Sequence, residues 1–195
     1  MIKIGILGDI GAGKSFVAKQ FRSPVFDADK EVRRIYKYDK SCYKKIKKKL
    51  PLFIKSKIIK KNELGVAIKT NKKNLKKISN IVHPIVRKRM NLFFKKNKHK
   101  KMVILDIPLL VENKLYDKKF FLIFVQSKIN EINKRLKKRP FYNKNIINNL
   151  RKLQKPLTYK KKISNYVIKN NFKPLSLRKE IKKIKREILN ERSSS

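Results

Sequence analysis

The sequence predicts an α/β fold in which helices flank a parallel β-sheet. Three features indicate it: short, almost uniformly apolar runs that suit buried strands, a glycine-rich loop directly after the first run, and helical segments between the runs. At 195 residues the chain is long enough for one core, and a chain of about this size buries roughly 70% of its unfolded surface. We therefore expect one globular unit with insertions.

The first strand and helix are readable from their apolar residues. Residues 2–7 are apolar enough to be buried on both faces, as a central strand of a parallel sheet is. The helix after the loop begins near Gly13 and is expected to turn Phe16, Val17 and Phe21 toward the sheet. Arg22-Ser23-Pro24 then ends this helix.

The glycine-rich loop, residues 8–15, reads GDIGAGKS and fits G-x-x-x-x-G-K-[ST], the phosphate-binding loop. Its glycines let backbone N–H groups converge on one anion, while Lys14 would neutralise phosphate oxygens and the Ser15 hydroxyl would ligate Mg²⁺. A glycine-rich turn without a ligand is the alternative. The residues expected to bind the nucleotide are Asp9, Ile10, Gly11, Ala12, Gly13, Lys14 and Ser15.

The chain is strongly basic. Lys and Arg number 56 against 13 Asp and Glu, which gives a net charge of +43. A lysine-rich surface attracts polyanions. The excess is spread along nearly the whole chain, however, and abundant Lys, Asn and Ile together indicate A/T-rich codons. We therefore expect no specific nucleic-acid partner.

No targeting or redox feature stands out. No apolar run approaches the ~20 residues of a membrane span, so no membrane partner is expected. The chain enters its first strand without a signal-peptide pattern, so we expect a cytoplasmic protein. The single cysteine, Cys42, lies in a lysine-rich stretch with no His or Cys nearby, and we expect it to be a bystander.

Carboxylates are scarce, so those near strand ends become candidates for metal or proton chemistry. A strand at residues 25–26 ends at Asp27-Ala28-Asp29, and at least one of the two carboxylates could face a site at the carboxyl edge of the sheet. The alternative is that Asp29 caps a helix starting at Lys30. The acidic residues in or just after strand ends are Asp9, Asp27, Asp29, Glu31, Asp106 and Glu112.

A third strand is predicted at residues 102–105. It ends in Asp106, the general shape of a Walker B strand. Asp106 could accept a hydrogen bond from a Mg²⁺-bound water or from Ser15, or it could cap a turn.

A long helical insertion is predicted at residues 30–94, because this lysine-rich stretch is too long for a simple crossover. We expect His83-Pro84 to end one helix and start another, since proline suits a first turn and disfavours helical geometry in the residue before it. One apolar helix face is expected from four residues at spacings of three and four: Leu75, Ile78, Val82 and Ile85.

The last part of the chain predicts strands at residues 120–125 and 166–168, with a helix at 128–138 after the first. Residues 140–159 form a polar helical segment that holds Arg151 and suits a mobile basic lid over phosphates, with a solvated surface helix as the alternative. A final helix carries an apolar stripe of Leu177, Ile181, Ile184 and Ile188.

Taken together, several motifs resemble the dephospho-coenzyme A kinases, P-loop kinases of the nucleoside monophosphate kinase group. The matching segments, in order along almost the whole chain, are residues 8–15, 26–29, His83-Pro84, 106–113, Arg139, 154–157 and 166–168. The resemblance implies a P-loop kinase fold with a five-stranded parallel sheet. It also implies three parts: a nucleotide-binding core of residues 1–29, 95–136 and 161–195, a helical acceptor-binding insertion of 30–94, and a helical lid of 137–160.

The resemblance further implies the reaction, which is transfer of the ATP γ-phosphoryl group to the ribose 3′-hydroxyl of dephospho-coenzyme A, with Mg²⁺. Asp29 is similar to the family's general base and Arg139 to its lid arginine, and Lys14 completes the implied catalytic residues. The implied acceptor-binding residues are Asp29, His83, Pro108 and Leu109, and the implied metal-site residues are Ser15 and, through water, Asp106. A monomer is expected.

The sequence departs from the family's pattern at several positions. Asn165 and Lys169 stand where the family often carries Asp, and Gly65-Val66 stands where it often carries an Asp-Arg pair. These departures leave contacts around the adenine, the lid and the acceptor open. Two other functions stay open as well: another small-molecule P-loop kinase, such as a nucleoside monophosphate kinase, and a nucleic-acid-binding ATPase.

Overall fold

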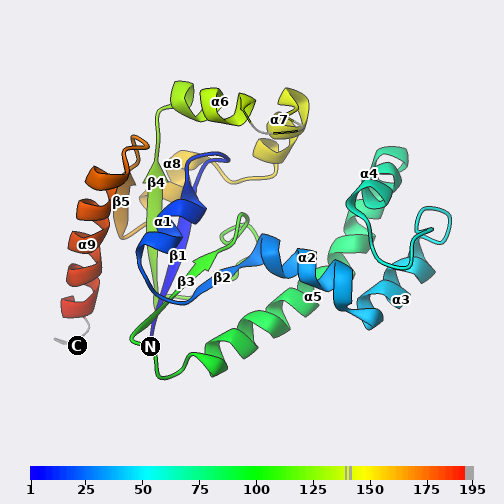
Figure 1. Ribbon diagram of the computed structural model, residues 1–195, viewed down its shortest axis with the longest axis horizontal. Helices are drawn as coiled ribbons and strands as arrows, with labels where there is room; N and C mark the ends of the chain where they lie inside the picture. Colours follow the sequence, from blue (N-terminus) through cyan, green and yellow to red (C-terminus); the bar gives the residue numbers. More distant parts are fainter. Residues whose placement is uncertain (139, 141, 192–195) are drawn as a thin grey trace. The chain divides into compact units, whose positions relative to one another are not determined.

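A five-stranded sheet organises the computed structural model, which describes residues 1–138, 140 and 142–191 (Figure 1). The strand order is β2-β3-β1-β4-β5 and every neighbouring pair is parallel, as predicted. All carboxyl ends therefore meet at one edge. The strands are β1 (Ile2–Gly8), β2 (Val25–Asp27), β3 (Met102–Asp106), β4 (Phe120–Gln126) and β5 (Tyr166–Lys169).

The described residues form two compact units. One consists of Met1–Asp27 and the described chain from Asn97 onward, and it contains the whole sheet. The other is Ala28–Lys96. No helix within the described parts of the chain is long and apolar enough to cross a membrane.

One face of the sheet packs against α1 (Lys14–Gln20) and α9 (Pro174–Glu191), and the buried residues of α6 (Ile129–Lys137) join the same apolar core. The predicted stripe of α9 is buried in full, and burial of each such side chain stabilises the fold by about 1.5–3 kcal/mol. In α1, Val17 and Phe21 are buried as expected, but Phe16 is 40% exposed. The prediction for Phe16 was wrong because Val17, Ala18 and Phe21 already fill the inward face of this two-turn helix.

The opposite face of the sheet carries the loop after β3 and helix α8 (Leu157–Lys162). Gly5 leaves room for this loop: a Cβ atom there would lie 2.5 Å from Leu110 Cδ2. The helical segment predicted at residues 140–159 contains α7 (Lys144–Lys152) and the start of α8. Pro156 separates them, because it lacks an N–H and disfavours helical geometry at Lys155.

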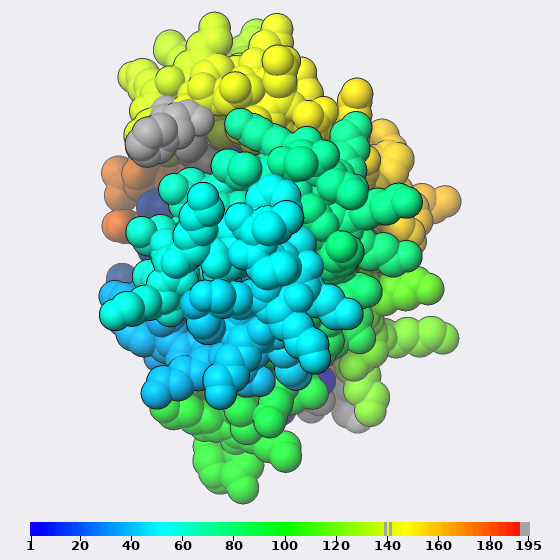
Figure 2. All heavy atoms as spheres, turned by 90° about the vertical axis from the view of Figure 1, so that its right-hand side faces the viewer, coloured from blue at the N-terminus to red at the C-terminus, as the bar shows by residue number. Residues whose placement is uncertain are grey.

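The second unit is helical, as its composition indicates. Two partly exposed ion pairs connect its helices: Arg89 contacts Glu31 at 3.3 Å and Asp39 at 3.5 Å. Figure 2 shows its closely packed side chains, coloured from blue to green along the chain. Its helices are α2 (Ala28–Tyr38), α3 (Lys40–Lys49), α4 (Lys61–Thr70) and α5 (Lys73–Lys96).

Helix α5 runs without interruption through Pro84, so the predicted break was wrong. Buried apolar residues lie on both sides of Pro84 and hold the helix together. Proline cannot donate a hydrogen bond to the Asn80 carbonyl, but Pro84 and Asn80 are both exposed to solvent, so water can bind that carbonyl. The predicted stripe is also shifted: Leu75 is 41% exposed, and Ile85 is only half-buried. The residues that α5 does bury are Asn74, Ile78, Val82, Val86 and Met90.

Candidate nucleotide-binding site

The glycine-rich loop joins β1 to α1 at the carboxyl edge of the sheet. Gly8, Gly11 and Gly13 all have positive φ, at 144°, 87° and 90°. At Gly13 a side chain is excluded twice, because the backbone is left-handed and a Cβ atom would lie 2.4 Å from Asn170 Nδ2. The loop is therefore shaped for close approach of a ligand to its backbone.

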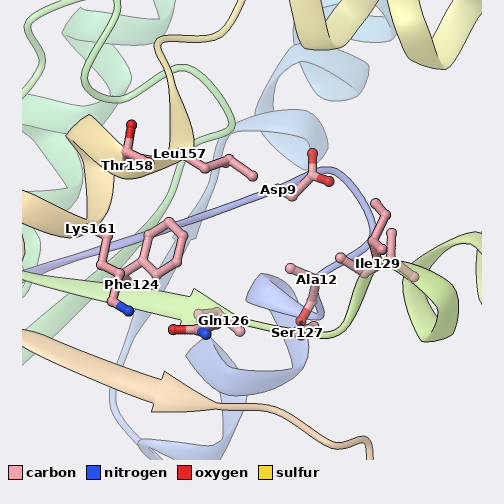
Figure 3. Close-up of a pocket in the computed structure, with 11 residues that line it drawn as sticks. Asp9, Ala12, Phe124, Gln126, Ser127, Ile129, Leu157, Thr158 and Lys161 are labelled. Carbon is pink, nitrogen blue, oxygen red and sulfur yellow. Dashed lines mark hydrogen bonds between the residues drawn. The ribbon is translucent and has the colours of Figure 1, made fainter.

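Two side chains outside the motif hold this loop in place. The Ala12 carbonyl accepts hydrogen bonds from Ser127 Oγ at 3.0 Å and from Asn170 Nδ2 at 2.9 Å. Figure 3 shows Ser127 directly beside Ala12. Neither residue was predicted from the sequence, although each directly follows a strand, β4 or β5, at the edge where α/β sheets place their sites.

Lys14 lies back across its own loop. Its Nζ donates to the Gly8 carbonyl at 3.1 Å and to the Asp9 carbonyl at 2.8 Å. Ser15, in the first turn of α1, is exposed. The Lys14 ammonium therefore lies at the start of the loop, beside the carbonyls of its first two residues.

The side chain of Asp9 is occupied by a residue far along the chain. Arg151 of α7 donates from Nε to Asp9 Oδ1 at 3.1 Å and from Nη2 to Oδ2 at 2.8 Å. The Ile10 N–H donates to Asp9 Oδ1 at 2.7 Å. Asp9 is only 5% exposed. The predicted lid segment therefore contacts the loop through an arginine and a carboxylate.

The carboxylates after β2 and β3 lie in different settings. Asp27 and Asp106 are direct cross-strand neighbours at the carboxyl edge, and Asp106 is 7% exposed. Asp29 instead belongs to the first turn of α2, which begins at Ala28. The alternative prediction, that Asp29 caps a helix starting at Lys30, is therefore wrong. A negative charge in the first turn of a helix interacts favourably with the helix dipole.

Glu112 joins the loop after β3 to the predicted lid. Its Oε1 accepts from Lys160 Nζ at 2.8 Å and from the Lys155 N–H at 2.8 Å. Lys160, only 1% exposed, also donates to Gln154 Oε1 at 3.0 Å. Burial raises the pKa of Glu112, but the hydrogen bonds and the Lys160 charge outweigh it and hold that pKa below its ordinary value.

The remaining expected site residues are spread over both units. Pro108 and Leu109 are half-buried in the turn after β3. His83 is exposed on α5, and partial desolvation and then the Arg87 charge lower its pKa. Arg139 lies outside the described residues.

The two family departures near β5 have structural partners. Asn165 Oδ1 accepts from the Leu122 N–H at 2.8 Å, and the Asn165 N–H donates to the Leu122 carbonyl at 2.8 Å. An Asp at this position would offer the same acceptor oxygen. The Lys169 N–H donates to Glu180 Oε1 at 3.3 Å. These residues join β5 to β4 and α9.

A cavity of about 240 Å³ lies beside the loop, between the end of β4 and α8 (Figure 3). Its wall is mainly apolar, with Phe124 and Leu157 on facing elements. Asp9 and Lys161 supply charges at its border.

The oxygen donors present fit a hard cation. Among the described residues, no group of three or more His, Cys, Asp or Glu could hold a metal ion. Ser15 and Asp106 offer a hydroxyl and a carboxylate, which suits Mg²⁺ because that ion keeps several waters and takes further ligands from phosphates.

The sheet order, the phosphate loop after the central strand and the helical segment over it define the class, a P-loop nucleotide-binding protein of the kinase type. A family model described as dephospho-CoA kinase matches residues 2–174. The chain therefore belongs to the dephospho-CoA kinase family.

Individual proteins agree with this assignment. The dephospho-CoA kinase of Wolbachia from Brugia malayi is 31% identical over 170 residues, which cover 85% of this chain and 87% of that protein. The crystal structure of TT1252 from Thermus thermophilus superposes with a TM-score of 0.77 at 26% identity, covering 95% of this chain and 97% of that one. Dephospho-CoA kinase from Campylobacter jejuni shares the fold, with a TM-score of 0.65 at 23% identity and 95% and 96% coverage.

Proposed function

We propose that this chain transfers the γ-phosphoryl group of ATP to the ribose 3′-hydroxyl of dephospho-coenzyme A, which yields coenzyme A and ADP in the last step of coenzyme A biosynthesis. The observation that carries this conclusion is the family match over residues 2–174. The intact phosphate loop agrees with it, because a kinase of this family uses ATP as its phosphoryl donor.

The backbone of residues 9–15 and the Lys14 ammonium bind the β- and γ-phosphates in this proposal. Three observations support it: the positive φ angles of the loop glycines, the two hydrogen bonds that fix the Ala12 carbonyl, and the position of Lys14 Nζ across the loop. Phosphoryl transfer depends mainly on positioning and charge stabilisation, so a rigid loop and a fixed cation serve it directly.

Asp29 accepts the proton of the acceptor hydroxyl. The hydroxyl oxygen attacks the γ-phosphorus, the bond from that phosphorus to the bridging oxygen of ADP breaks, and the proton passes to the carboxylate. The position of Asp29, two residues after β2, supports this role because β2 ends at the carboxyl edge of the sheet. Arg139 stabilises the transferring charge, a role that can contribute on the order of 10³–10⁵ in rate.

His83, Pro108 and Leu109 contact the acceptor in this proposal. The lowered pKa of His83 favours its neutral form at pH 7, which both donates and accepts hydrogen bonds. Mg²⁺, held by Ser15 and through water by Asp106, would supply charge neutralisation at the phosphates. A cytoplasmic location and a monomeric state stay predictions.

A coupled ADP-release assay over an acceptor panel tests the proposed function. The panel contains dephospho-coenzyme A, AMP, CMP and shikimate, with RNA and single-stranded DNA in separate wells at physiological salt. We expect turnover with dephospho-coenzyme A above every other acceptor. Preference for a nucleoside monophosphate, or ATP hydrolysis that depends on nucleic acid, would contradict the proposal.

A further inference from the structure

An acidic side chain stands inside a loop that binds a polyanion. Asp9 directly follows β1 at the second position of the phosphate loop, and its side chain is almost fully buried. A carboxylate here repels the phosphates of a nucleotide, and burial strengthens that repulsion because little water screens it. The loop therefore needs a compensating cation.

Arg151 supplies that cation with a defined geometry. Its guanidinium binds Asp9 through two parallel N–H···O contacts of 3.1 and 2.8 Å, the fork arrangement that a lysine cannot reproduce. With the Ile10 N–H at 2.7 Å, both oxygens of Asp9 are occupied. The contact joins residues 142 positions apart and fixes α7 against the loop.

The charges of the loop can then be counted. Asp9 and Arg151 cancel, and Lys14 remains as the net positive charge for the phosphates. Removal of Arg151 alone would leave Asp9 uncompensated. For unit charges about 7 Å apart in an effective dielectric constant of about 20, one uncompensated charge changes the affinity for an anion roughly 50-fold.

We propose that Asp9 and Arg151 form a charge-compensating clamp that sets ATP affinity and positions α7 over the phosphate loop. Both are positioning residues, since Arg151 acts on the nucleotide through Asp9. The clamp rests on the proposed function only in taking ATP as the ligand.

The clamp predicts an asymmetry between its two partners. Arg151→Met exposes the nucleotide to the Asp9 charge, so it weakens ATP binding roughly 50-fold. Asp9→Asn removes that charge and leaves the Arg151 cation uncompensated, so the variant binds ATP more tightly than wild type, while amide exchange in α7 becomes faster. The double variant restores neutrality, so it binds ATP within about five-fold of wild type and more tightly than Arg151→Met.

Isothermal titration with ATP tests the clamp on four variants of the full chain: Arg151→Met, Asp9→Asn, the double variant, and Lys152→Met as the control. Lys152→Met removes an exposed positive charge from the same helix and should change affinity less than about three-fold. Circular dichroism confirms that each variant folds.

Two results would overturn the clamp: Arg151→Met that binds ATP as wild type does, or a double variant that binds as weakly as Arg151→Met. If the four variants show the predicted ATP affinities but the wild-type chain does not phosphorylate dephospho-coenzyme A, the clamp is supported and the proposed function is contradicted. The two failures are therefore distinguishable.

Discussion

Lys160 offers the sharpest test of how the predicted lid is attached to the core. It is a lysine with 1% exposure, held by Glu112 Oε1 at 2.8 Å and Gln154 Oε1 at 3.0 Å. Lys160→Met keeps most of the side-chain volume and removes the charge. Glu112 then keeps the Lys155 N–H as its hydrogen-bond donor from the predicted lid. Its Oε2 is already buried without a hydrogen-bond partner among the described residues.

The expected cost is about 3–5 kcal/mol in the free energy of unfolding at pH 7, because removal of one partner leaves a buried charge uncompensated. Lost packing adds little, since methionine fills a similar volume. Lys162→Met removes an exposed lysine of the same helix and should stay within about 0.5 kcal/mol of wild type. Combining Lys160→Met with Glu112→Gln removes both charges and should recover part of the loss.

The Glu112–Lys160 pair also predicts how the free energy of unfolding depends on pH. The pKa of Glu112 is lowered in the folded protein, so its stabilisation is present above its unfolded pKa of about 4.3 and is lost as the pH falls through the folded value. In Lys160→Met, burial without the lysine raises that pKa instead. The difference in the free energy of unfolding between wild type and Lys160→Met should therefore become smaller from pH 7 toward pH 4.

Urea unfolding followed by circular dichroism measures both effects, since the chain has no Trp to report by fluorescence. A Lys160→Met variant within about 1 kcal/mol of wild type at pH 7 would refute the reasoning, as would a gap that does not change with pH.

Three further predictions concern the reaction. Asp29→Asn should lower kcat by roughly 10²–10⁴ while ATP binding is largely retained, and an unchanged kcat would remove Asp29 from the mechanism. Lys14→Ala should weaken ATP binding and turnover, and normal values for both would contradict the phosphate-loop assignment. Gly13→Ala should lower ATP affinity at least about ten-fold, because its Cβ meets Asn170 Nδ2 in a left-handed backbone. Gly65→Ala is the matched control, with nothing within 4 Å of its Cβ, and normal ATP affinity in Gly13→Ala would refute the steric argument.

The sheet was predictable because its signals are local. Buried strands of a parallel sheet read as continuous apolar runs, and the loop motif follows the first of them directly. Ser127 and Asn170 could have been found by the same rule, since both directly follow strands. Each of the five strands was predicted from its own apolar run, whereas the substrate came from the family resemblance.

The partners of the acidic residues could not be predicted, because they lie far along the chain. The sequence selected Asp9, Glu31 and Glu112 alike by their position near strand ends. The structure pairs Asp9 with Arg151, Glu31 with Arg89, and Glu112 with Lys160, so each of the three has a distant partner. Glu31 also has a local partner, Arg34, three residues along α2. Periodicity carries no information about such long-range pairs.

Local propensity also failed where packing decides the outcome. Pro84 predicts a break in the helix, yet α5 is continuous because residues on both sides of Pro84 are buried. Phe16 predicts burial, yet Val17, Ala18 and Phe21 leave it no place on the inner face of α1. Pro156 does separate two helices, α7 and α8, in the segment predicted to be helical.

The measurement that tests the central claim most directly is the initial rate of ADP release with each acceptor at saturating ATP. The assignment to the dephospho-CoA kinase family predicts the highest kcat/KM with dephospho-coenzyme A, and phosphate added at its ribose 3′-hydroxyl, which mass spectrometry and phosphorus NMR of the product identify. A higher kcat/KM with AMP or CMP, or a product phosphorylated elsewhere, would contradict it.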